Sequence, residues 1–307
     1  MVVTTDDGGV TWRRVASPAS TLADLTGLQG SPHIQFADAH DGWIIGAGLW
    51  ATHDGGATWK RANLPGFTEG ARVADIAVAG DAAWVLSFGS ETRLLRSPVA
   101  GDDWTEVPQT GVAGTGGRLA GSGSMLWEWV SGATANGTAI SKLVATDDAG
   151  ATWSDRPLPC PAPGAIALGD GIGLVACGGG SAAGSQEKQA YLTHDDGLTF
   201  ELLTNPPFGG SLWGAGVRDA DTLFVAAVSG ATFLYGSSDA GGTWSTVFEG
   251  AGGGANLTDL AFTSATSGAF VLGYTSDVSG GQPSVLVMTS DGGGSWHAAS
   301  VAVAGGD

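Results

Sequence analysis

One eight-residue motif occurs seven times along this chain and constrains its fold more than any other feature. The first copy reads Thr5-Asp6-Asp7-Gly8-Gly9-Val10-Thr11-Trp12, and a worn copy that ends at Trp104 has Val99 in the place of the aspartate. The aromatic residues that close the copies are Trp12, Trp59, Trp104, Trp153, Phe200, Trp244 and Trp296. They are 44 to 52 residues apart. A period of this length predicts a repeat architecture, in which each repeat is one supersecondary unit.

The motif has the chemistry of a tight turn between two strands. Its aspartate can accept hydrogen bonds from the backbone amides that follow it, and its glycine can adopt a positive φ that other residues resist. Short apolar runs such as Leu143-Val144-Ala145 precede the motif, and its final Thr-Trp pair begins a new strand. We therefore expect the aspartates of the six intact copies to be structural braces at the periphery of the molecule. They are Asp7, Asp54, Asp148, Asp195, Asp239 and Asp291.

The motif resembles the Asp-box of BNR repeats, S/T-x-D-x-G-x-T-W/F, and the resemblance spans the whole chain. The units also resemble blades of the photosystem II assembly and stability factor type. In the second unit, residues 33–38 and 41–46 follow the order of that family's inner and second strands before the box. The resemblance implies an all-β fold, a β-propeller of four-stranded antiparallel blades. It constrains function less, because BNR propellers include sialidases, other glycosidases, sorting receptors and non-catalytic assembly factors.

A single propeller domain is expected over residues 1–307, because no linker interrupts the period. Only 14% of the residues are charged and the 53 glycines show no triplet period, so neither a disordered nor a collagen-like chain is indicated. Nine of the twelve tryptophans fall at repeat positions, where we expect them to pack between neighbouring blades. The predicted blade boundaries are about 1–16, 32–64, 72–108, 118–159, 164–204, 212–249 and 256–304.

The first repeat is shorter than the others. Its box begins at Thr5, which leaves room for only a third and a fourth strand before the loop around residues 17–31. We expect a seven-bladed propeller with an incomplete first blade, since an open ring exposes strand edges that proteins normally cover. Truncation of a longer gene product is the explanation that this expectation favours. A six-bladed ring with a loose extra hairpin is the alternative.

The chain is acidic, with a formal net charge of −18 and a pI of about 4.3. Its three lysines do not supply the clustered cations that phosphate binding requires, so a general nucleic-acid role is excluded. No run of eighteen apolar residues predicts a membrane span. His53 and His194 lie at variable box positions without a supporting cluster, and no metal or other cofactor is expected.

The two cysteines bear on the location of the protein. Cys160 and Cys177 flank a predicted hairpin in which residues 165–168 return as residues 172–176. A disulfide between them indicates export, and two reduced core cysteines are the alternative. Many relatives of this repeat class act outside the cytoplasm. We therefore predict an extracytoplasmic or cell-surface location.

Function in propellers usually collects at the mouth of the central channel, on the loops between the outer strand of one blade and the inner strand of the next. His33, Arg72 and Arg118 lie just before or at the start of three consecutive inner strands, and Arg93 lies in a neighbouring loop. Converging guanidinium groups there would suit a carboxylate on an acidic sugar or on a protein side chain. Trp213 is also expected on this face, where it stacks on a sugar ring or fills the channel.

Local ion pairs are the alternative for two of these arginines. In that interpretation Arg118 pairs with Glu128 across its own hairpin, and Arg72 pairs with nearby Glu69. A ligand site requires the arginine side chains to point toward the channel mouth, whereas local ion pairs require them to point toward Glu128 and Glu69. The sequence leaves both interpretations open.

An enzymatic role would require more than the sequence offers. Glycoside hydrolysis normally uses two carboxylates, and sialidases use a tyrosine activated by a glutamate, beside three arginines. Tyr274 alone lies in a channel-face loop, since Tyr191 and Tyr235 share one repeat position. No recognisable pair is formed by the conceivable acids, which are Glu69, Glu91 and Glu128.

The sequence therefore predicts a non-catalytic BNR-repeat propeller that acts as a binding or assembly module through its channel face. Its predicted partner is a protein or a glycan, and a carboxylate-bearing partner would suit the cations named above. The alternative is a glycoside hydrolase of the sialidase-like type. No catalytic residue is assigned.

Overall fold

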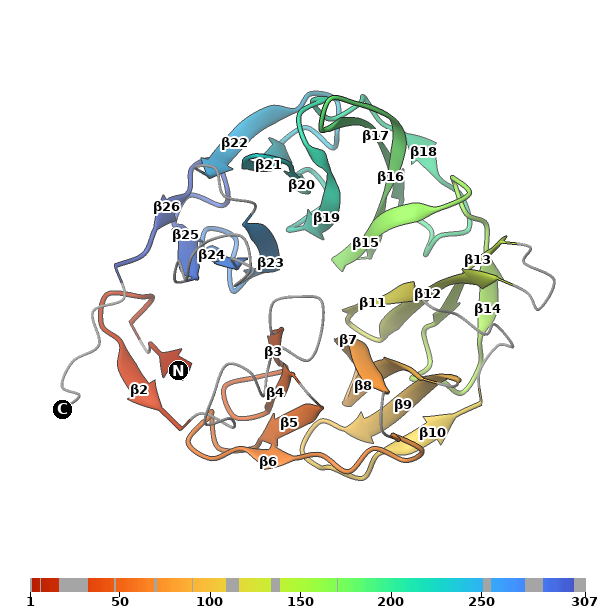
Figure 1. The fold of residues 1–307 in the computed structure, drawn as a ribbon, viewed down its shortest axis with the longest axis vertical. Helices are drawn as coiled ribbons and strands as arrows, with labels where there is room; N and C mark the ends of the chain where they lie inside the picture. The colour runs from red at the N-terminus through yellow and green to blue at the C-terminus, as the bar shows by residue number, and fades with distance from the viewer. Residues whose placement is uncertain are drawn as a thin grey trace.

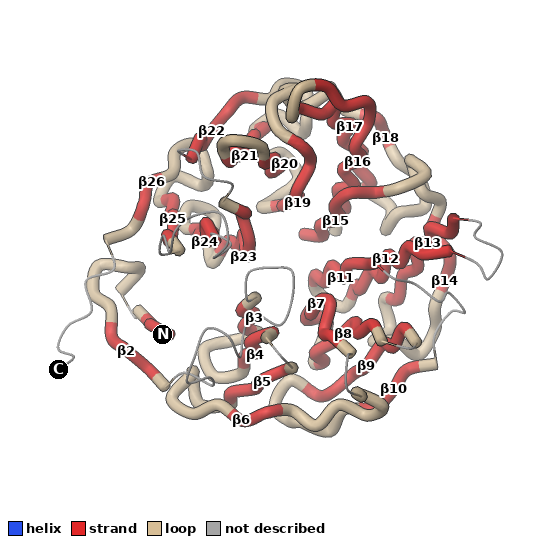
Figure 2. Tube along the Cα trace, in the orientation of Figure 1, coloured by secondary structure: helices blue, strands red, loops and turns tan. Residues whose placement is uncertain are grey.

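The computed structural model describes residues 2–5, 7–16, 33–46, 48–68, 71–89, 91–108, 116–133, 139–169, 171–250, 255–273 and 284–300. Every regular element in these ranges is a β-strand (Figure 2). The described residues accordingly contain no helix that is long and apolar enough to cross a membrane.

In the described residues, six four-stranded antiparallel sheets and one two-stranded sheet form a ring (Figure 1). We number these sheets as blades 1 to 7 in chain order. Blade 1 contains β1 (Val2–Thr4) and β2 (Arg13–Val15). Blade 2 contains β3 (Ile34–Phe36), β4 (Gly42–Ile45), β5 (Leu49–Thr52) and β6 (Lys60–Arg61), and blade 3 contains β7 (Arg72–Ala79), β8 (Ala82–Phe88), β9 (Thr92–Pro98) and β10 (Thr105–Val107).

The remaining four blades have the same order of strands. Blade 4 contains β11 (Gly116–Ser122), β12 (Met125–Ala133), β13 (Ala139–Thr146) and β14 (Ser154–Arg156). Blade 5 contains β15 (Pro163–Gly169), β16 (Ile172–Ala182), β17 (Ser185–Thr193) and β18 (Glu201–Leu202). Blade 6 contains β19 (Ser211–Val217), β20 (Leu223–Val228), β21 (Thr232–Ser237) and β22 (Ser245–Gly250), and blade 7 contains β23 (Asn256–Phe262), β24 (Gly268–Gly273), β25 (Val285–Thr289) and β26 (His297–Ala298).

The predicted all-β propeller of four-stranded antiparallel blades is confirmed. Among the described residues six blades are complete, which is the blade count of the alternative prediction. The two-stranded blade 1 is not a loose hairpin, because it lies in the ring between blades 7 and 2 (Figure 1). Its Gly9 packs so closely on blade 7 that a Cβ there would lie 2.8 Å from the sulfur of Met288.

Each box turn is held by its aspartate. In blade 4, Oδ1 of Asp148 accepts hydrogen bonds from the hydroxyl of Thr146 and the amide of Thr152, both at 2.8 Å. Its Oδ2 accepts the hydroxyl of Thr152 at 2.7 Å, and the hydroxyl of Thr146 accepts the amide of Gly150 at 2.9 Å. The hydroxyl and amide of Thr152 lower the pKa of Asp148 to about 2. The same arrangement recurs at Asp7, Asp54, Asp195, Asp239 and Asp291.

In blades 1 and 4 to 7, the glycine in the fifth place of the box contacts the preceding blade of the ring. Gly150 has a φ of +87°, and a Cβ there would lie 2.4 Å from the ring of Trp84 in blade 3. Gly293 has a φ of +97°, and its Cβ would lie 2.4 Å from the ring of Phe224 in blade 6. Glycine is therefore required both for the backbone conformation and for the close approach of the neighbouring blade.

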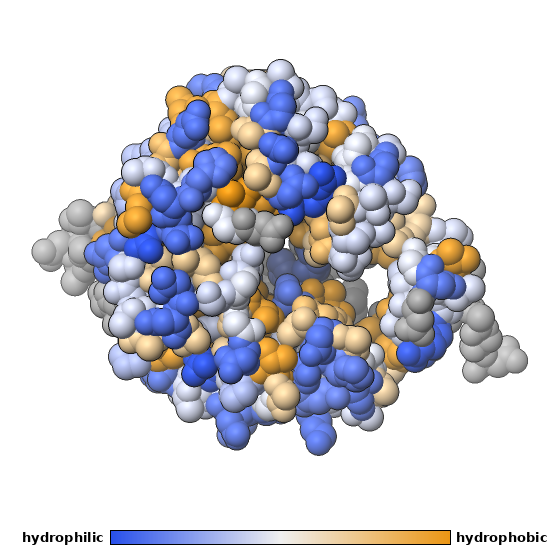
Figure 3. All heavy atoms as spheres, turned by 180° about the vertical axis from the view of Figure 1, so that it is seen from behind, coloured by the Kyte–Doolittle hydropathy of each residue, from blue (hydrophilic) through white to orange (hydrophobic). Residues whose placement is uncertain are grey.

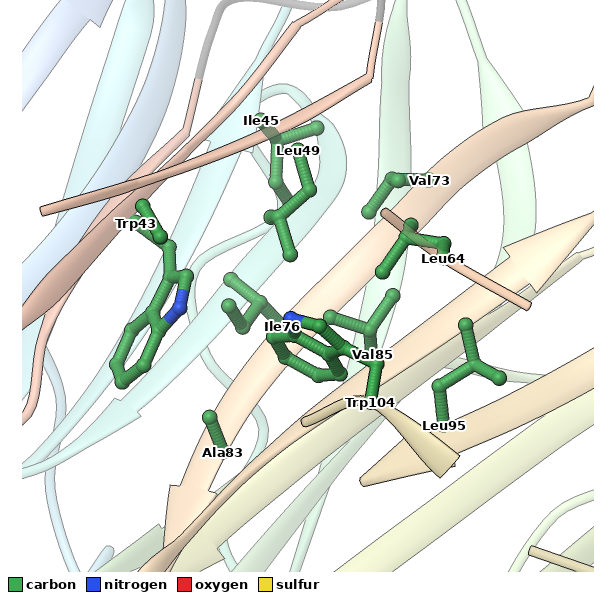
Figure 4. Close-up of a cluster of buried hydrophobic side chains, with 11 residues drawn as sticks. Trp43, Ile45, Leu49, Leu64, Val73, Ile76, Ala83, Val85, Leu95 and Trp104 are labelled. Atoms are coloured by element: carbon green, nitrogen blue, oxygen red, sulfur yellow. The ribbon is translucent and has the colours of Figure 1, made fainter. Parts of the chain in front are cut away.

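Aromatic side chains form the cores between blades. Trp84 and Trp153 pack edge to face with ring centroids 5.9 Å apart, and Trp127 and Phe200 do so at 6.1 Å. Between blades 2 and 3, a buried cluster joins the fully buried Trp43 to residues such as Trp104 (Figure 4). The hydrophobic core of this protein is thus divided among the interfaces between blades.

We predict that Asp148→Ala lowers the melting temperature, because the amide and hydroxyl of Thr152 and the hydroxyl of Thr146 lose their acceptor. Since the folded pKa of about 2 is below the unfolded value of 3.8, this carboxylate contributes stability above about pH 4 and loses it as the pH falls toward 2. Thermal melts followed by circular dichroism between pH 7 and pH 2 measure both effects, and the variant should lose less stability in acid than the parent.

The neighbouring Asp147→Ala is the matched control, because Asp147 is exposed and lies at the variable second position of the same box. Its melting temperature should stay close to that of the parent. Equal melting temperatures for the Asp147 and Asp148 variants would contradict the bracing role.

Candidate functional site

The candidate site lies where the inner strands of five blades approach the centre of the ring. Figure 3 shows the ring hollowed at its centre, with hydrophilic and hydrophobic residues mixed around the hollow. β7 carries Asp75, β11 carries Arg118, β19 carries Trp213 and β23 carries Asp259, while His33 directly precedes β3. We call these five residues the channel group.

His33 and Asp259 connect blade 2 to blade 7. Nδ1 of His33 lies 2.7 Å from Oδ1 of Asp259, and the imidazole is about half exposed. Desolvation lowers the pKa of His33, but the hydrogen bond and charge of Asp259 and the charge of Asp75 outweigh it, so that its pKa is raised. Asp259 is held at a bulge in β23 with a φ of +56°, a conformation that is uncommon outside glycine. The bulge re-aims its side chain toward His33.

Asp75 occupies a corresponding bulge in β7. Its Oδ2 accepts the amide of Leu119 on β11 at 3.0 Å, and its Oδ1 accepts the amide of Ile76 at 2.9 Å. Burial raises the pKa of Asp75, and the charges of His33 and Arg118 act in the opposite direction. The carboxylate therefore joins blade 3 to blade 4 next to the only cation of β11.

Arg118 and Glu128 do not share a face of their sheet. The register pairs Arg118 with Trp129 and Leu119 with Glu128, so the two charged side chains leave opposite faces. Arg118 is exposed and donates to the carbonyl of Gly117 at 3.1 Å, whereas Glu128 is 2% exposed. Burial raises the pKa of Glu128 to about 7. The structure thus brings Arg118 to His33 and Asp75, and it does not support the predicted local pair.

The other two predicted cations have different surroundings. The guanidinium of Arg72 lies 5.0 Å from the ring centre of Phe88, its partner across the β7–β8 pair. Arg93 forms ion pairs with Glu91 and Glu106. The suggested partner of Arg72, Glu69, lies outside the described residues. Arg72 and Arg93 therefore have surroundings distinct from the contacts that link His33 to Arg118.

Trp213 gives the site an anchored aromatic surface. It lies at a bulge of β19, and its indole N–H donates to the carbonyl of Leu257 on β23 at 2.9 Å. The bond fixes the ring between blades 6 and 7 and leaves the residue 41% exposed. An exposed ring with its polar atom already bonded can stack on a ligand without further loss of hydrogen bonds.

Lys188 supports the strand that carries Trp213. This lysine is fully buried, and the three N–H groups of its Nζ are shared among the carbonyl oxygens of Gln186, Phe208, Gly209 and Gly210, which lie 2.7 to 3.0 Å away. Burial lowers the pKa of Lys188 to about 8, while the four carbonyl oxygens favour its charged form. Because Gly210 directly precedes β19, this cage fixes the start of the strand.

The sequence analysis does not predict a role for Asp75, Asp259 or Lys188. A sequence pattern does mark the two aspartates, because each lies within an apolar inner strand, as Asp75-Ile76-Ala77 and Asp259-Leu260-Ala261. A charged residue within such a strand requires a buried partner. No sequence pattern indicates the partners of Lys188, because they are backbone carbonyls. One belongs to Gln186, and the others lie 20 to 22 residues further along the chain.

Two further features lie apart from the channel group. A pocket of about 340 Å³ is lined by residues of blade 2 and the segment that follows it, among them Leu49, Arg61 and Phe67. Within the described ranges, no group of three or more His, Cys, Asp or Glu side chains is arranged to hold a metal ion. Cys160 and Cys177 are joined by a disulfide between the segment before β15 and the neighbouring strand β16.

Comparison with known proteins agrees with this architecture. The family model described as photosynthesis system II assembly factor YCF48 matches residues 23–156. A solved structure described as "YCF48 bound to D1 peptide" has a TM-score of 0.56 and 18% identity, over 87% of this chain and 79% of that one. The chain is a β-propeller.

The match to the photosystem II assembly-factor model is confined to blades within residues 23–156, which is less than half of the chain. YCF48 from Cyanidioschyzon merolae is also similar, with a TM-score of 0.53 and 16% identity over 90% of this chain and 89% of that one. At such identities, the solved structures establish the fold of the propeller alone. No curated protein matches the chain.

We predict that Asp259→Asn lowers the pKa of His33, because the variant removes the charge that raises it and leaves the desolvation that lowers it. A titration of the histidine resonances by NMR measures this pKa in the parent and the variant. The pKa of His33 is higher in the folded than in the unfolded protein. The ion pair of His33 with Asp259 therefore stabilises the fold fully below the unfolded pKa of the histidine, and this stabilisation is lost as the pH rises through the folded pKa.

Asp221→Asn is the control, because Asp221 is an exposed aspartate outside the channel group. It should leave the titration of His33 unchanged. An unchanged pKa in the Asp259 variant would contradict the linkage between blades 2 and 7.

Proposed function

We propose that this propeller is a non-catalytic protein-binding module and that the channel group is its contact site. The observation that carries the proposal is that the inner strands of separate blades carry an exposed arginine near His33 and an exposed tryptophan bonded to the strand of Asp259. Tryptophan and arginine are the residues that most often dominate the energy of protein interfaces. The described similarity to "YCF48 bound to D1 peptide" supports a peptide partner over other classes.

The charges of the channel group restrict the kind of peptide. Asp75 and Asp259 offset much of the positive charge of His33 and Arg118, so the site is not the purely cationic funnel expected from the sequence. A carboxylate of the partner would bind the outer side of the Arg118 guanidinium, and an apolar or aromatic side chain would lie on Trp213. This arrangement suits an extended peptide with one acidic and one apolar residue.

The residues named for glycoside hydrolysis have surroundings that favour binding over catalysis. Glu91 pairs with Arg93, and Glu128 is buried within blade 4. Tyr235 is buried and donates to the carbonyl of Gly209 at 2.8 Å. Glu69 and Tyr274 lie outside the described residues. A glycan partner has no support beyond the exposed ring of Trp213.

The disulfide supports an extracytoplasmic or cell-surface location for this module. Bonds such as that between Cys160 and Cys177 persist in oxidising compartments and are rare in reducing ones. We therefore propose that the partner is encountered outside the reducing cytoplasm. An acidic surface favours solubility there and disfavours contact with anionic membranes.

The test is a selection from a displayed library of random peptides, with a D1 peptide included as a defined member. We expect selected peptides to bind the parent and to lose at least tenfold in affinity for Trp213→Ala and for Arg118→Ala, by calorimetry. A tenfold loss corresponds to about 1.4 kcal/mol, which is within the range of a single interface contact.

Asp148→Ala is the control for the box turns, because it alters a box turn and not the channel group. Selected peptides should bind this variant as they bind the parent, at a temperature where both are folded. Loss of binding in the Asp148 variant with full binding in the Trp213 and Arg118 variants would place the contact site on the box turns and overturn the proposal.

A further inference from the structure

The second strand of blade 5 extends past its inner strand. β15 pairs with β16 as far as Pro163 and Cys177, and β16 then continues to Ala182. From Gly178 onward its pairs are with β17 alone, which lies on the outer side of β16. In blades 3, 6 and 7, by contrast, the second strand ends where the inner strand begins. We call residues 178–182 the free edge, since no described strand pairs with their inner side.

The sequence before β15 explains why the pairing stops at Cys177. Pro161 and Pro163 carry no N–H group and cannot donate a hydrogen bond to a neighbouring strand. The disulfide from Cys160 holds this segment beside Cys177, with the two Cα atoms 6.4 Å apart. Residues 157–162 are all described, and they form neither a strand nor a backbone hydrogen bond to the free edge.

The free edge is open to solvent. All of its residues are exposed, and a Cβ at Gly180 would have no atom within 4 Å beyond its chain neighbours. Gly179 and Gly180 lie in a bulge and have no partner on β17. The carbonyl of Gly179 accepts the side-chain amide of Gln186 at 3.4 Å, and among the described residues no hydrogen bond joins the free edge to another blade. An edge of this kind offers its N–H and C=O groups to a further strand.

The hairpin that carries the free edge is held by blade 6. The amide of Gln186 donates to the carbonyl of Gly210 at 3.1 Å, and its Oε1 accepts the amide of Leu212 at 3.0 Å. Lys188, on the same hairpin, donates to the carbonyls of that segment. The free edge is therefore fixed before a partner arrives, which lowers the entropy that binding must offset.

The free edge faces the channel. β15 is the inner strand of blade 5, and β16 lies outside it (Figure 1). The side of β16 that β15 leaves uncovered is therefore directed toward the centre of the ring. Trp213 lies on the next blade at the same end of the strands, because its neighbour Leu212 is bonded to Gln186. A chain that pairs with the free edge can continue toward Trp213.

We propose that the free edge binds an extended segment of the partner by β-strand addition. This occupant rests on the proposed function, in which the partner of the channel group is a peptide. The inference adds the way in which that peptide is held. Backbone hydrogen bonds to the free edge fix the extended segment, and the residues that follow it reach the channel group.

The surroundings of the free edge restrict the segment that can be added. Residues 178–182 carry no charge, and Gly179 and Gly180 leave room for large side chains on the added strand. The acidic Glu187 lies beside this position, since a Cβ at Gly179 would be 3.2 Å from its Cβ. An acidic residue is therefore disfavoured here. The added segment has uncharged aromatic or β-branched side chains, which also favour an extended strand.

The probe for this site is the peptide Lys-Thr-Tyr-Val-Tyr-Thr-Lys with both ends blocked. We expect it to bind the intact protein in calorimetry and to slow the hydrogen exchange of amides in residues 178–182. The same peptide with N-methyl groups on its three central amides has the same side chains but lacks the N–H groups that pair with a strand. It should bind at least tenfold more weakly.

A protein variant tests the free edge itself. Gly180→Pro removes an N–H group of the edge and should weaken binding of the probe at least tenfold. Gly230→Pro is the matched control, because Gly230 lies in the corresponding connection of blade 6 and also has no atom within 4 Å of its Cβ position. It should bind the probe as the parent does. If Gly180→Pro destabilises the protein, the N-methylated probe on the parent still tests the site.

Three results would overturn strand addition. They are failure of the parent to bind the probe, equal binding of the methylated and unmethylated probes, and a parent dimer in sedimentation that Gly180→Pro dissociates. The dimer would make a second copy of this chain the occupant.

The channel group is tested apart from the free edge. Because the probe has no acidic residue, Arg118→Ala should leave its affinity unchanged. Loss of probe binding alone would leave the proposed function standing. Binding of the probe, in a protein whose library-selected peptides are insensitive to Trp213→Ala and Arg118→Ala, would support the free edge and overturn the proposed contact site.

Discussion

The ring depends on the close approach of box turns to the preceding blade, which the box glycines of blades 1 and 4 to 7 make. The aspartate holds the turn, and the turn places a glycine with positive φ against a large side chain of the preceding blade, as Gly150 lies against Trp84. Because a methyl group in that place would overlap the ring, the turn and the interface are coupled at one residue. The repeated hydrogen bonds of the box turn therefore help to determine how neighbouring blades are arranged around the ring.

Because the box turns hold the blades together at the periphery, the centre of the ring is available to bind a partner. The inner strands meet there through polar links between blades, such as His33 with Asp259 and the carboxylate of Asp75 with the amide of Leu119. Trp213 is held by the neighbouring blade, and its strand is fixed in turn by the carbonyl cage of Lys188. The channel group therefore stands on a rigid support, which reduces the entropy that a partner's binding must offset.

The sequence predicted the fold well because the box is a local signal with a local structure. Asp148, Thr146 and Thr152 are within six residues of one another, so their hydrogen bonds do not require knowledge of distant parts. The channel group is different, since its contacts join residues as far apart as His33 and Asp259. Its geometry depends on bulges that the sequence pattern does not mark, and a single step of register decided that Arg118 faces away from Glu128.

The coupling of turn and interface is tested most directly by comparing Gly150→Ala with Gly56→Ala. The two glycines have nearly the same φ, +87° and +84°, but a Cβ at position 150 would lie 2.4 Å from Trp84. Among the described residues, the atom nearest to a Cβ at position 56 belongs to Trp59 and is 3.5 Å away. The free energy of unfolding of the two variants, from denaturant titrations, should show a larger loss for Gly150→Ala, by about 1–3 kcal/mol. Equal losses would mean that backbone strain alone explains the box glycine, and they would contradict the account.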